Sequence, residues 1–309
     1  IEIVSGEIIG DRRQLSINYP AIISQLKKGA EIYIDDGRIK LEVISSSAKK
    51  ARAKVLVGGE IKPRKGFYAQ GIALDLKDLS AKDKADLQMM HDAGADAIAV
   101  SFVQTAEDVE QVRKRLPKGC QMMLVSKIET AKAIENIDSI IDVTDAVMIA
   151  RGDLGLAVPM EEVPYLQKKL ITKSLEKAKP VITATQMLES MTHNPLPTRA
   201  EVTDVANAIL DGTDCVMLSG ETASGEFPVE TIQMMVKIIR SSVPHIERRE
   251  YFHEHAISNA VSSSIGKIAD QIDSKLIIAF TEKGVTARRI SRNRHPETIL
   301  ALSPDEGVV

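Results

Sequence analysis

Two short apolar segments, each ending in charged residues, constrain the fold more than any other feature of the sequence. They are Met122–Glu129 (MMLVSKIE) and Ala146–Leu156 (AVMIARGDLGL). Short apolar runs of this kind are typical of strands buried in a parallel sheet. Apolar residues recur on one face of Thr130–Asp142, between the two runs, and this spacing predicts a helix. A strand, a helix and a second strand of these lengths predict a βαβ unit, so we expect the two strands to lie side by side.

Charged residues follow both predicted strands at their carboxyl ends, where parallel α/β folds bind their ligands. Lys127 and Glu129 are two positions apart, so their side chains should point the same way, and Arg151 and Asp153 follow the second strand. Two carboxylates on adjacent strands offer the oxygen ligands that Mg²⁺ or Mn²⁺ prefers, and a lysine beside them would face a bound anion. After Ile149 we expect a tight turn into a short helix, whose free N–H groups favour an anion. The alternative is a cluster of surface ion pairs at loop ends.

Five motifs occur in order along the chain, two of them within the segments described above. They are SKIE (126–129), ARGDLG (150–155), TATQMLESM (Thr183–Met191), PTRAEVTDVANAILDG (Pro197–Gly212) and MLSGETA (Met217–Ala223). In this order they resemble the pyruvate kinase family, and the resemblance runs through nearly the whole chain. It implies phosphoryl transfer from phosphoenolpyruvate to ADP, which gives pyruvate and ATP in the last step of glycolysis.

The resemblance also implies roles for the charged cluster. Lys127 would stabilise the transferring phosphoryl group and the enolate charge. Glu129 and Asp153 would hold Mg²⁺ or Mn²⁺. The backbone of Arg151, Gly152 and Asp153 would bind the substrate carboxylate.

Four more polar residues have two readings each. Thr185, after the strand predicted over Val181–Ala184, is either a helix-capping hydroxyl or, by the resemblance, part of the relay that protonates the enolate. Glu221 is either the partner in a capping box or a support for neighbouring loops. Glu201 and Asp204 lie one turn apart on a predicted helix, which the family uses in a subunit contact; a solvated helix face is the alternative.

Residues 1–70 predict β structure, a small antiparallel barrel or sandwich, because Glu31–Asp35 and Arg38–Ile44 alternate between apolar and polar positions. Asp36-Gly37 predicts a type I′ hairpin turn. The region resembles the lid domain that pyruvate kinases close over bound nucleotide. Asp36 and Lys65 match lid positions that face the nucleotide and its metal, while turn chemistry and surface charge are the alternatives.

Residues 71–245 contain five predicted strands separated by helices, the pattern of a (β/α)₈ TIM barrel that is three strands short. The resemblance implies that the other three precede the lid and hold most ligands for K⁺ and the arginine that binds the substrate phosphate. The sequence differs from the usual family pattern in two places. These are the segment Gly66–Gly71 at the hinge, and Gln104, where the family usually has an arginine. An unclosed barrel leaves two hydrogen-bonding edges.

Residues 246–309 resemble the first half of the family's C-terminal α/β domain, which often binds a phosphorylated effector. The sequence predicts a helix over His253–Ile272, followed by a strand, a helix and a strand. Thr281, Lys283 and Thr286 flank a glycine turn into that second helix, which suits a phosphate cradle or an ordinary strand-to-helix turn.

Composition excludes several classes of function. The net charge of −3 would not attract nucleic acid or an anionic membrane electrostatically. Only two cysteines occur, which favours a reduced cytoplasmic setting over a disulfide framework. There is no P-loop, Rossmann fingerprint, zinc cysteine pairing, signal peptide or membrane-spanning run. The resemblance further implies a homotetramer. A catalytically silent subunit or fragment is the main alternative, and a metal-dependent pyruvate-enolate aldolase is a weaker one.

Overall fold

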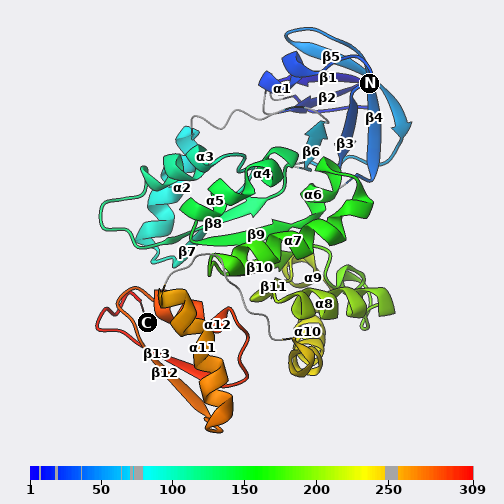
Figure 1. Cartoon of the computed structure of the whole chain (residues 1–309). Helices are drawn as coiled ribbons and strands as arrows, with labels where there is room; N and C mark the ends of the chain where they lie inside the picture. The colour runs from blue at the N-terminus through cyan, green and yellow to red at the C-terminus, as the bar shows by residue number, and fades with distance from the viewer. Residues whose placement is uncertain are drawn as a thin grey trace. The chain divides into compact units, whose positions relative to one another are not determined.

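The computed structural model describes residues 1–6, 8–17, 20–35, 37–63, 65–69, 72, 79–247 and 257–308. The chain divides into two compact units, which are described separately below (Figure 1). The first unit comprises Ile1–Asp78 together with Gly152–Glu161. The second comprises Leu79–Arg151 and Glu162–Val309. None of the helices in the described part of the chain is long and apolar enough to cross a membrane.

In its described residues, the Ile1–Asp78 part of the first unit forms the predicted β structure, a six-stranded sheet with one short helix. The Gly152–Glu161 part contributes most of the helix α6 (Arg151–Ala157) and a 3₁₀ turn. The strand order is β2-β1-β5-β4-β3-β6, and the fully buried core includes Ile3, Ile32 and Leu41. β1 and β2 are parallel, which corrects the expectation of a purely antiparallel sheet. Alternation predicts strands but not their direction, and the connection after β1 returns the chain to the start of that strand. The elements are β1 Glu2–Ser5, β2 Gln14–Ile17, α1 Pro20–Gln25, β3 Glu31–Ile34, β4 Ile39–Ser46, β5 Lys50–Val57 and β6 Phe67–Ala69.

The predicted hairpin joins β3 to β4. The two strands are antiparallel, with Ile34 opposite Ile39, and the turn closes with a hydrogen bond of 3.1 Å from Arg38 N to the carbonyl of Asp35. Gly37 has a φ of +83°, which glycine adopts without steric strain. Asp36 lies outside the described residues, so the turn type and the nucleotide role predicted for it stay predictions.

The second unit contains the predicted five-stranded parallel sheet. Its strand order, β11-β10-β9-β8-β7, follows the sequence, and every neighbouring pair is parallel. The α/β fold with successive parallel strands is therefore confirmed, and β7 and β11 are the edge strands of this sheet as far as the chain is described. The strands are β7 Ala97–Val100, β8 Met123–Ile128, β9 Ala146–Ala150, β10 Val181–Ala184 and β11 Cys215–Met217.

Helices connect these strands, and two of them differ from the predictions. The helix predicted over Thr130–Asp142 is broken at Asn136, whose side chain donates hydrogen bonds to the carbonyls of Gln104 and Lys132. No tight turn precedes the helix after β9, because that helix begins directly at Arg151. The helices are α2 Ala81–Asp92, α3 Ala106–Arg113, α4 Ala131–Glu135, α5 Ile137–Val143, α6 Arg151–Ala157, α7 Val163–Glu176, α8 Arg199–Asp211, α9 Gly220–Ala223 and α10 Pro228–Ser242, with short 3₁₀ turns at Met160–Glu162, Glu189–Thr192 and Val243–His245.

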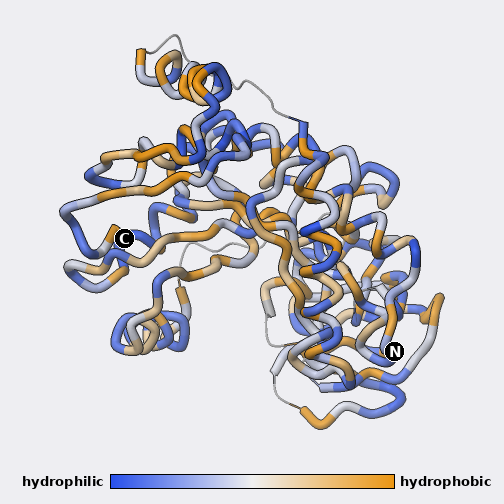
Figure 2. The backbone as a smooth tube through the Cα atoms, turned by 90° about the horizontal axis from the view of Figure 1, so that it is seen from below, coloured by the Kyte–Doolittle hydropathy of each residue, from blue (hydrophilic) through white to orange (hydrophobic). Residues whose placement is uncertain are grey.

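A Thr-Asp pair before β9 ties that strand to β8. The hydroxyl of Thr144 donates at 2.9 Å to the carbonyl of Leu124 and accepts a hydrogen bond of 2.9 Å from the hydroxyl of Ser126. The carboxylate of Asp145 accepts from the backbone N–H of Leu124, also at 2.9 Å. All five residues of β9 are buried, and Figure 2 shows such hydrophobic stretches alternating with hydrophilic ones along the chain.

The same pair recurs before β11. Thr213 donates to the carbonyl of Val181 and accepts a hydrogen bond of 3.0 Å from the hydroxyl of Thr183, while Asp214 accepts from the N–H of Val181 at 2.9 Å. The two Thr-Asp pairs therefore form hydrogen bonds with backbone groups of the neighbouring strands at the amino-terminal edge of the sheet. They precede β9 and β11, which are separated by β10.

The C-terminal part of the second unit is a two-stranded parallel sheet with two helices. Small and aliphatic residues on one face of the sheet pack against the helices. Arg292 and Arg294 attach this part to the five-stranded sheet region by donating to the carbonyls of Glu176 and Gly212, and Arg294 also pairs with Asp214 at 2.9 Å. The elements are α11 Ile257–Gln271, β12 Leu276–Phe280, α12 Val285–Ser291 and β13 Thr298–Leu302.

Candidate active site

Lys127 and Glu129 form an ion pair at the carboxyl end of β8. The Nζ of Lys127 lies 3.0 Å from Oε2 of Glu129 and 2.9 Å from the hydroxyl of Ser101, at the end of the neighbouring strand. The intervening residue, Ile128, is fully buried on the other side of the strand. The prediction that the two charged side chains point the same way is therefore confirmed.

Glu129 is almost completely removed from solvent, with 1% of its surface exposed. A buried carboxylate is stable only when it is compensated by charge and hydrogen bonds. Its Oε1 accepts a hydrogen bond of 2.6 Å from the backbone N–H of Phe102, which adopts a left-handed φ of +56° to present that group. The carboxylate is therefore held in a fixed position by one strand end and charge-balanced by Lys127.

Gln104, where the family usually has an arginine, is 5% exposed and belongs to the fold around this loop. Its backbone N–H donates to Asp108, and its carbonyl accepts from Asn136. The backbone of Gln104 is thus held in place by the side chains of Asp108 and Asn136.

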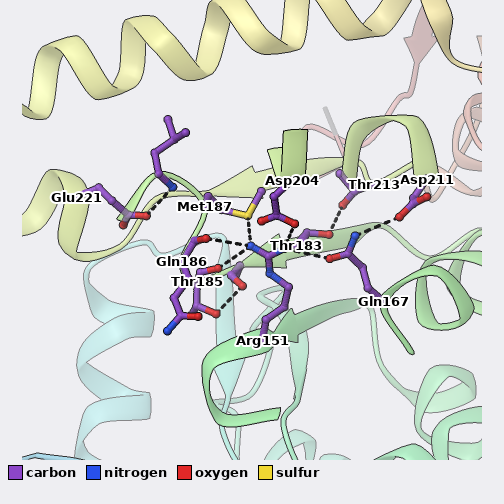
Figure 3. Close-up of polar contacts among 12 residues, drawn as sticks. Arg151, Gln167, Thr183, Thr185, Gln186, Met187, Asp204, Asp211, Thr213 and Glu221 are labelled. Carbon is purple, nitrogen blue, oxygen red and sulfur yellow. Dashed lines mark hydrogen bonds and ion pairs between the residues drawn. The ribbon is translucent and has the colours of Figure 1, made fainter. Parts of the chain in front are cut away.

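The side chain of Arg151 is the centre of a network that joins four segments of the second unit (Figure 3). Its Nη1 lies 2.8 Å from Oδ1 of Asp204 on α8 and 3.2 Å from Oε1 of Gln167 on α7. Its Nη2 donates at 2.8 Å to the carbonyl of Thr185 and at 3.3 Å to that of Gln186, and lies 2.8 Å from the sulfur of Met187. A planar guanidinium with five donors suits such divergent acceptors, which a lysine could not reach together.

Thr185 and Gln186 are held in a strained conformation after β10. Their φ angles are +70° and +52°, in the left-handed region that β-branched residues such as threonine strongly disfavour. The hydroxyl of Thr185 donates to the carbonyl of Ala184 at 2.6 Å, and the next short helix is capped at Leu188. The helix-capping interpretation of Thr185 is therefore wrong, and the strain points to a turn that the surrounding contacts enforce.

Two buried or half-buried glutamates fix the loops beside this turn. Glu221 is fully buried and accepts hydrogen bonds from the backbone N–H groups of Ser219 at 2.7 Å and Leu188 at 3.3 Å. It therefore supports two loops and does not act in a capping box.

Glu201 closes the capping box of α8 with Thr198 and also accepts two hydrogen bonds from Ser190, at 2.7 and 2.6 Å. Burial raises its pKa, but the hydrogen bonds from Ser190 and Thr198 outweigh that effect and hold the pKa below its ordinary value. Neither Glu201 nor Asp204 is simply a charge on a solvated helix face, because Asp204 pairs with Arg151. The spacing of these residues along α8 contained no signal for partners outside the helix.

The remaining predicted residues of the first unit are Gly152, Asp153 and Lys65. Gly152 and Asp153 lie in the first turn of α6, and Asp153 is half-buried. Lys65 lies 2.7 Å from Oδ1 of Asp35, and this hydrogen bond, despite desolvation, lowers the pKa of that carboxyl. Joint binding of a metal by Glu129 and Asp153, which belong to different units, stays a prediction. Within the described ranges, no group of three or more His, Cys, Asp or Glu side chains is placed to hold a metal ion.

The predicted effector turn is present between β12 and α12. Gly284 has a φ of +72° and precedes the first residue of α12, while the side chains of Lys283 and Thr286 are exposed. Thr281 is buried, and its N–H donates to the carbonyl of Leu302 at 2.9 Å. The strand-to-helix turn is confirmed, and its phosphate role stays a prediction.

Known proteins match both parts of the chain. The family model described as pyruvate kinase, barrel domain, matches residues 5–232, and the model described as pyruvate kinase, alpha/beta domain, matches residues 259–309. A pyruvate kinase of Agrobacterium vitis is 45% identical over 92% of this chain and 61% of its own length. One from Geobacillus stearothermophilus is 40% identical over 98% of this chain and 53% of its own length.

A solved structure is similar over the whole chain. The crystal structure of a pyruvate kinase from Cryptosporidium parvum aligns with a TM-score of 0.89 and 35% sequence identity, covering 100% of this chain and 66% of that one. This chain thus spans about half to two thirds of the length of the relatives it matches.

The network around Arg151 predicts unequal effects of two substitutions. Arg151→Met should lower the free energy of unfolding by about 2–4 kcal/mol, because several hydrogen bonds to the strained turn are lost and the buried Gln167 side chain also loses a donor. Asp204→Asn, at the partly exposed end of the same network, should lower it by less than about 1 kcal/mol. Urea unfolding of the two variants checks this. Equal losses would mean that the ion pair, and not the turn, is what the guanidinium stabilises.

The depressed pKa of Glu201 predicts a pH-dependent contribution to stability. The ionised carboxylate is the form that its hydrogen bonds favour, so its contribution should be present at neutral pH and disappear as pH falls below about 4.3 and through the lower folded-state value. Glu201→Gln should therefore be less stable than the original chain at pH 7, with the difference shrinking at pH 3. Glu135→Gln, at an exposed position, should differ little at either pH. A loss from Glu201→Gln that is the same at pH 7 and pH 3 would contradict the role of the charge.

Proposed function

Because the chain belongs to the pyruvate kinase family, we propose that it contributes one side of an active site for phosphoryl transfer from phosphoenolpyruvate to ADP, giving pyruvate and ATP. The observation that carries the proposal is the Lys127–Glu129 pair at the carboxyl edge of the parallel sheet, with 3.0 Å between Nζ and Oε2. The reaction is proposed for the complete polypeptide, since this chain covers 61% and 53% of the first two relatives.

Lys127 is suited to stabilise negative charge that develops during the transfer. Its ammonium group is held by Ser101 and by Glu129, so little reorganisation is needed when charge appears beside it. A side chain that is 23% exposed can still meet a ligand at this edge. Positioning and electrostatic stabilisation are the main contributions of a protein to phosphoryl transfer.

The donor set around Glu129 fits a hard divalent cation. Its carboxylate is 1% exposed and held by a backbone N–H, and such oxygens are the ligands that Mg²⁺ and Mn²⁺ prefer. We therefore propose that Glu129 and Asp153 would hold Mg²⁺ or Mn²⁺. The bound cation would offset negative charge on the oxygens of the substrate.

The turn at Thr185 supports a role in proton delivery. The contacts of Arg151 hold Thr185 in a conformation that a threonine does not adopt by itself, which fixes the direction of its hydroxyl. We propose that Thr185 takes part in protonating the enolate. The backbone of Gly152 and Asp153, with that of Arg151, would bind the substrate carboxylate.

Other features of the family extend the proposal. Asp36 and Lys65 would face the nucleotide, and Thr281, Lys283 and Thr286 would bind an effector phosphate. Most ligands for K⁺ would come from the three barrel strands that precede the lid in the family. A homotetramer in the cytoplasm is the assembly and location that the family resemblance favours.

The proposed metal pair predicts stabilisation by divalent cations. Saturating Mn²⁺ should raise the melting temperature of the chain, because an ion that binds only the folded state stabilises it by mass action. Asp153→Ala should abolish that rise, whereas Glu135→Ala should retain it. An unchanged melting temperature of a folded sample in saturating Mn²⁺ would exclude the site.

The role of Lys127 predicts a selective loss of turnover. With the missing strands supplied, covalently or as a separate piece, Lys127→Met should lower kcat by at least about 100-fold while phosphoenolpyruvate binding changes less. Lys132→Met, at an exposed position on α4, is the matched control. The chain alone should form no appreciable ATP, because positioning of the phosphoryl group is incomplete.

Three outcomes would count against this assignment. Near-normal turnover of Lys127→Met would favour the alternative interpretation, in which Lys127 only forms an ion pair at the end of the strand. K⁺-dependent turnover by the isolated chain would mean that other residues carry the chemistry. A folded, complemented protein that forms no ATP would support the catalytically silent alternative.

A further inference from the structure

A second concentration of charge lies at the amino-terminal edge of the five-stranded sheet, opposite the edge that carries Lys127. It surrounds a cavity of about 190 Å³. Asp145 precedes β9, and Lys177 and Lys179 lie between α7 and β10. Arg288 and Arg289 reach the same cavity from α12 in the C-terminal part of the unit. The cavity thus joins two parts of the chain that are far apart in sequence.

Positive charge in this cavity exceeds the negative charge available to balance it. The carboxylate of Asp145 is already engaged, at 2.9 Å from Nη2 of Arg113. Lys177 is paired with Asp142 at 2.8 Å, outside the lining. Across the ranges that the structure describes, Lys179, Arg288 and Arg289 form no ion pair.

Lys179 lies within this positive cluster with its ammonium group turned toward the protein. Its Nζ donates a hydrogen bond of 2.6 Å to the carbonyl of Thr144. Burial is the main cause that lowers its pKa, and the nearby cations Arg288 and Arg113 lower it further, while Asp145 and Asp142 act in the opposite direction. An anion in the cavity would relieve this repulsion.

We propose that the cavity formed by Lys179, Arg288 and Arg289 binds a phosphate group, either as inorganic phosphate or as the phosphoryl end of a small metabolite. Two guanidinium groups offer the forked donors that phosphate oxygens accept. The cavity volume of 190 Å³ is below the roughly 300 Å³ of pockets that enclose larger ligands. The cavity could therefore enclose a phosphate group but not the whole of a larger metabolite. A bound phosphate would link the sheet edge to α12. Val285 of the Thr281–Thr286 turn also lines the cavity, so the proposed site adjoins that turn but takes its charge from Lys179, Arg288 and Arg289. The proposal does not depend on the proposed reaction.

Calorimetric titration of the 309-residue chain with inorganic phosphate, at constant ionic strength, tests the proposal. The chain should bind phosphate, and Arg288→Gln combined with Arg289→Gln should weaken that binding at least tenfold. Lys169→Gln combined with Lys237→Gln removes the same charge from exposed positions on α7 and α10, and should change the affinity less than twofold. Lys179→Met, with folding checked by circular dichroism, should also weaken binding. A parallel titration with glycerol phosphate shows whether an attached organic group adds affinity.

Each other result overturns the proposal. Absence of binding by the folded chain excludes the site. Equal weakening by the control pair means that phosphate responds only to net charge. Loss of binding in Lys283→Gln, with full binding in the Arg288 and Arg289 double variant, would place the phosphate on the turn before α12 instead.

Discussion

The guanidinium of Arg151 is the contact on which the carboxyl edge of the sheet depends. It leaves the end of β9 and reaches α7, α8 and the turn after β10, so that one side chain connects elements from two successive βα units. The carbonyls to which it donates belong to Thr185 and Gln186, two residues with positive φ. The side chain of Arg151 is 10% exposed, which reduces competition of bulk water for its donors. Local strain at Thr185 is therefore maintained by long-range packing.

Carboxylates hold the other loops of this edge in the same way. Glu129 accepts a hydrogen bond from the backbone N–H of Phe102, and Glu221 accepts hydrogen bonds from those of Ser219 and Leu188. Each carboxylate thus fixes the backbone of a loop that comes from a different strand. A rigid scaffold of this kind keeps reactive groups in place at a sheet edge, where loops would otherwise move independently.

The sequence predicted the parts of this arrangement that depend on local patterns. Apolar runs identified the parallel strands, and the two-residue spacing placed Lys127 beside Glu129. It did not predict the break at Asn136, because the hydrogen bond that stabilises it goes to Gln104, 32 residues away. The partners of Asp204 and Glu201 were missed for the same reason, since helix spacing describes only neighbours on the same helix. The parallel pairing of β1 and β2 was also missed, because alternation carries no information on strand direction.

The Thr-Asp pairs before β9 and β11 act against slippage of one strand along its neighbour. In a parallel sheet whose strands are almost uniformly aliphatic, a shift by two residues would exchange one valine or isoleucine for another at little loss of apolar contact. Such a shift would, however, separate the hydroxyl of Thr144 from that of Ser126 and the hydroxyl of Thr213 from that of Thr183. It would also leave Asp145 and Asp214 without the N–H groups of Leu124 and Val181. Four polar side chains thereby select a single alignment, with Val125 opposite Ala146 and Ile182 opposite Cys215, from several that hydrophobic packing alone would tolerate.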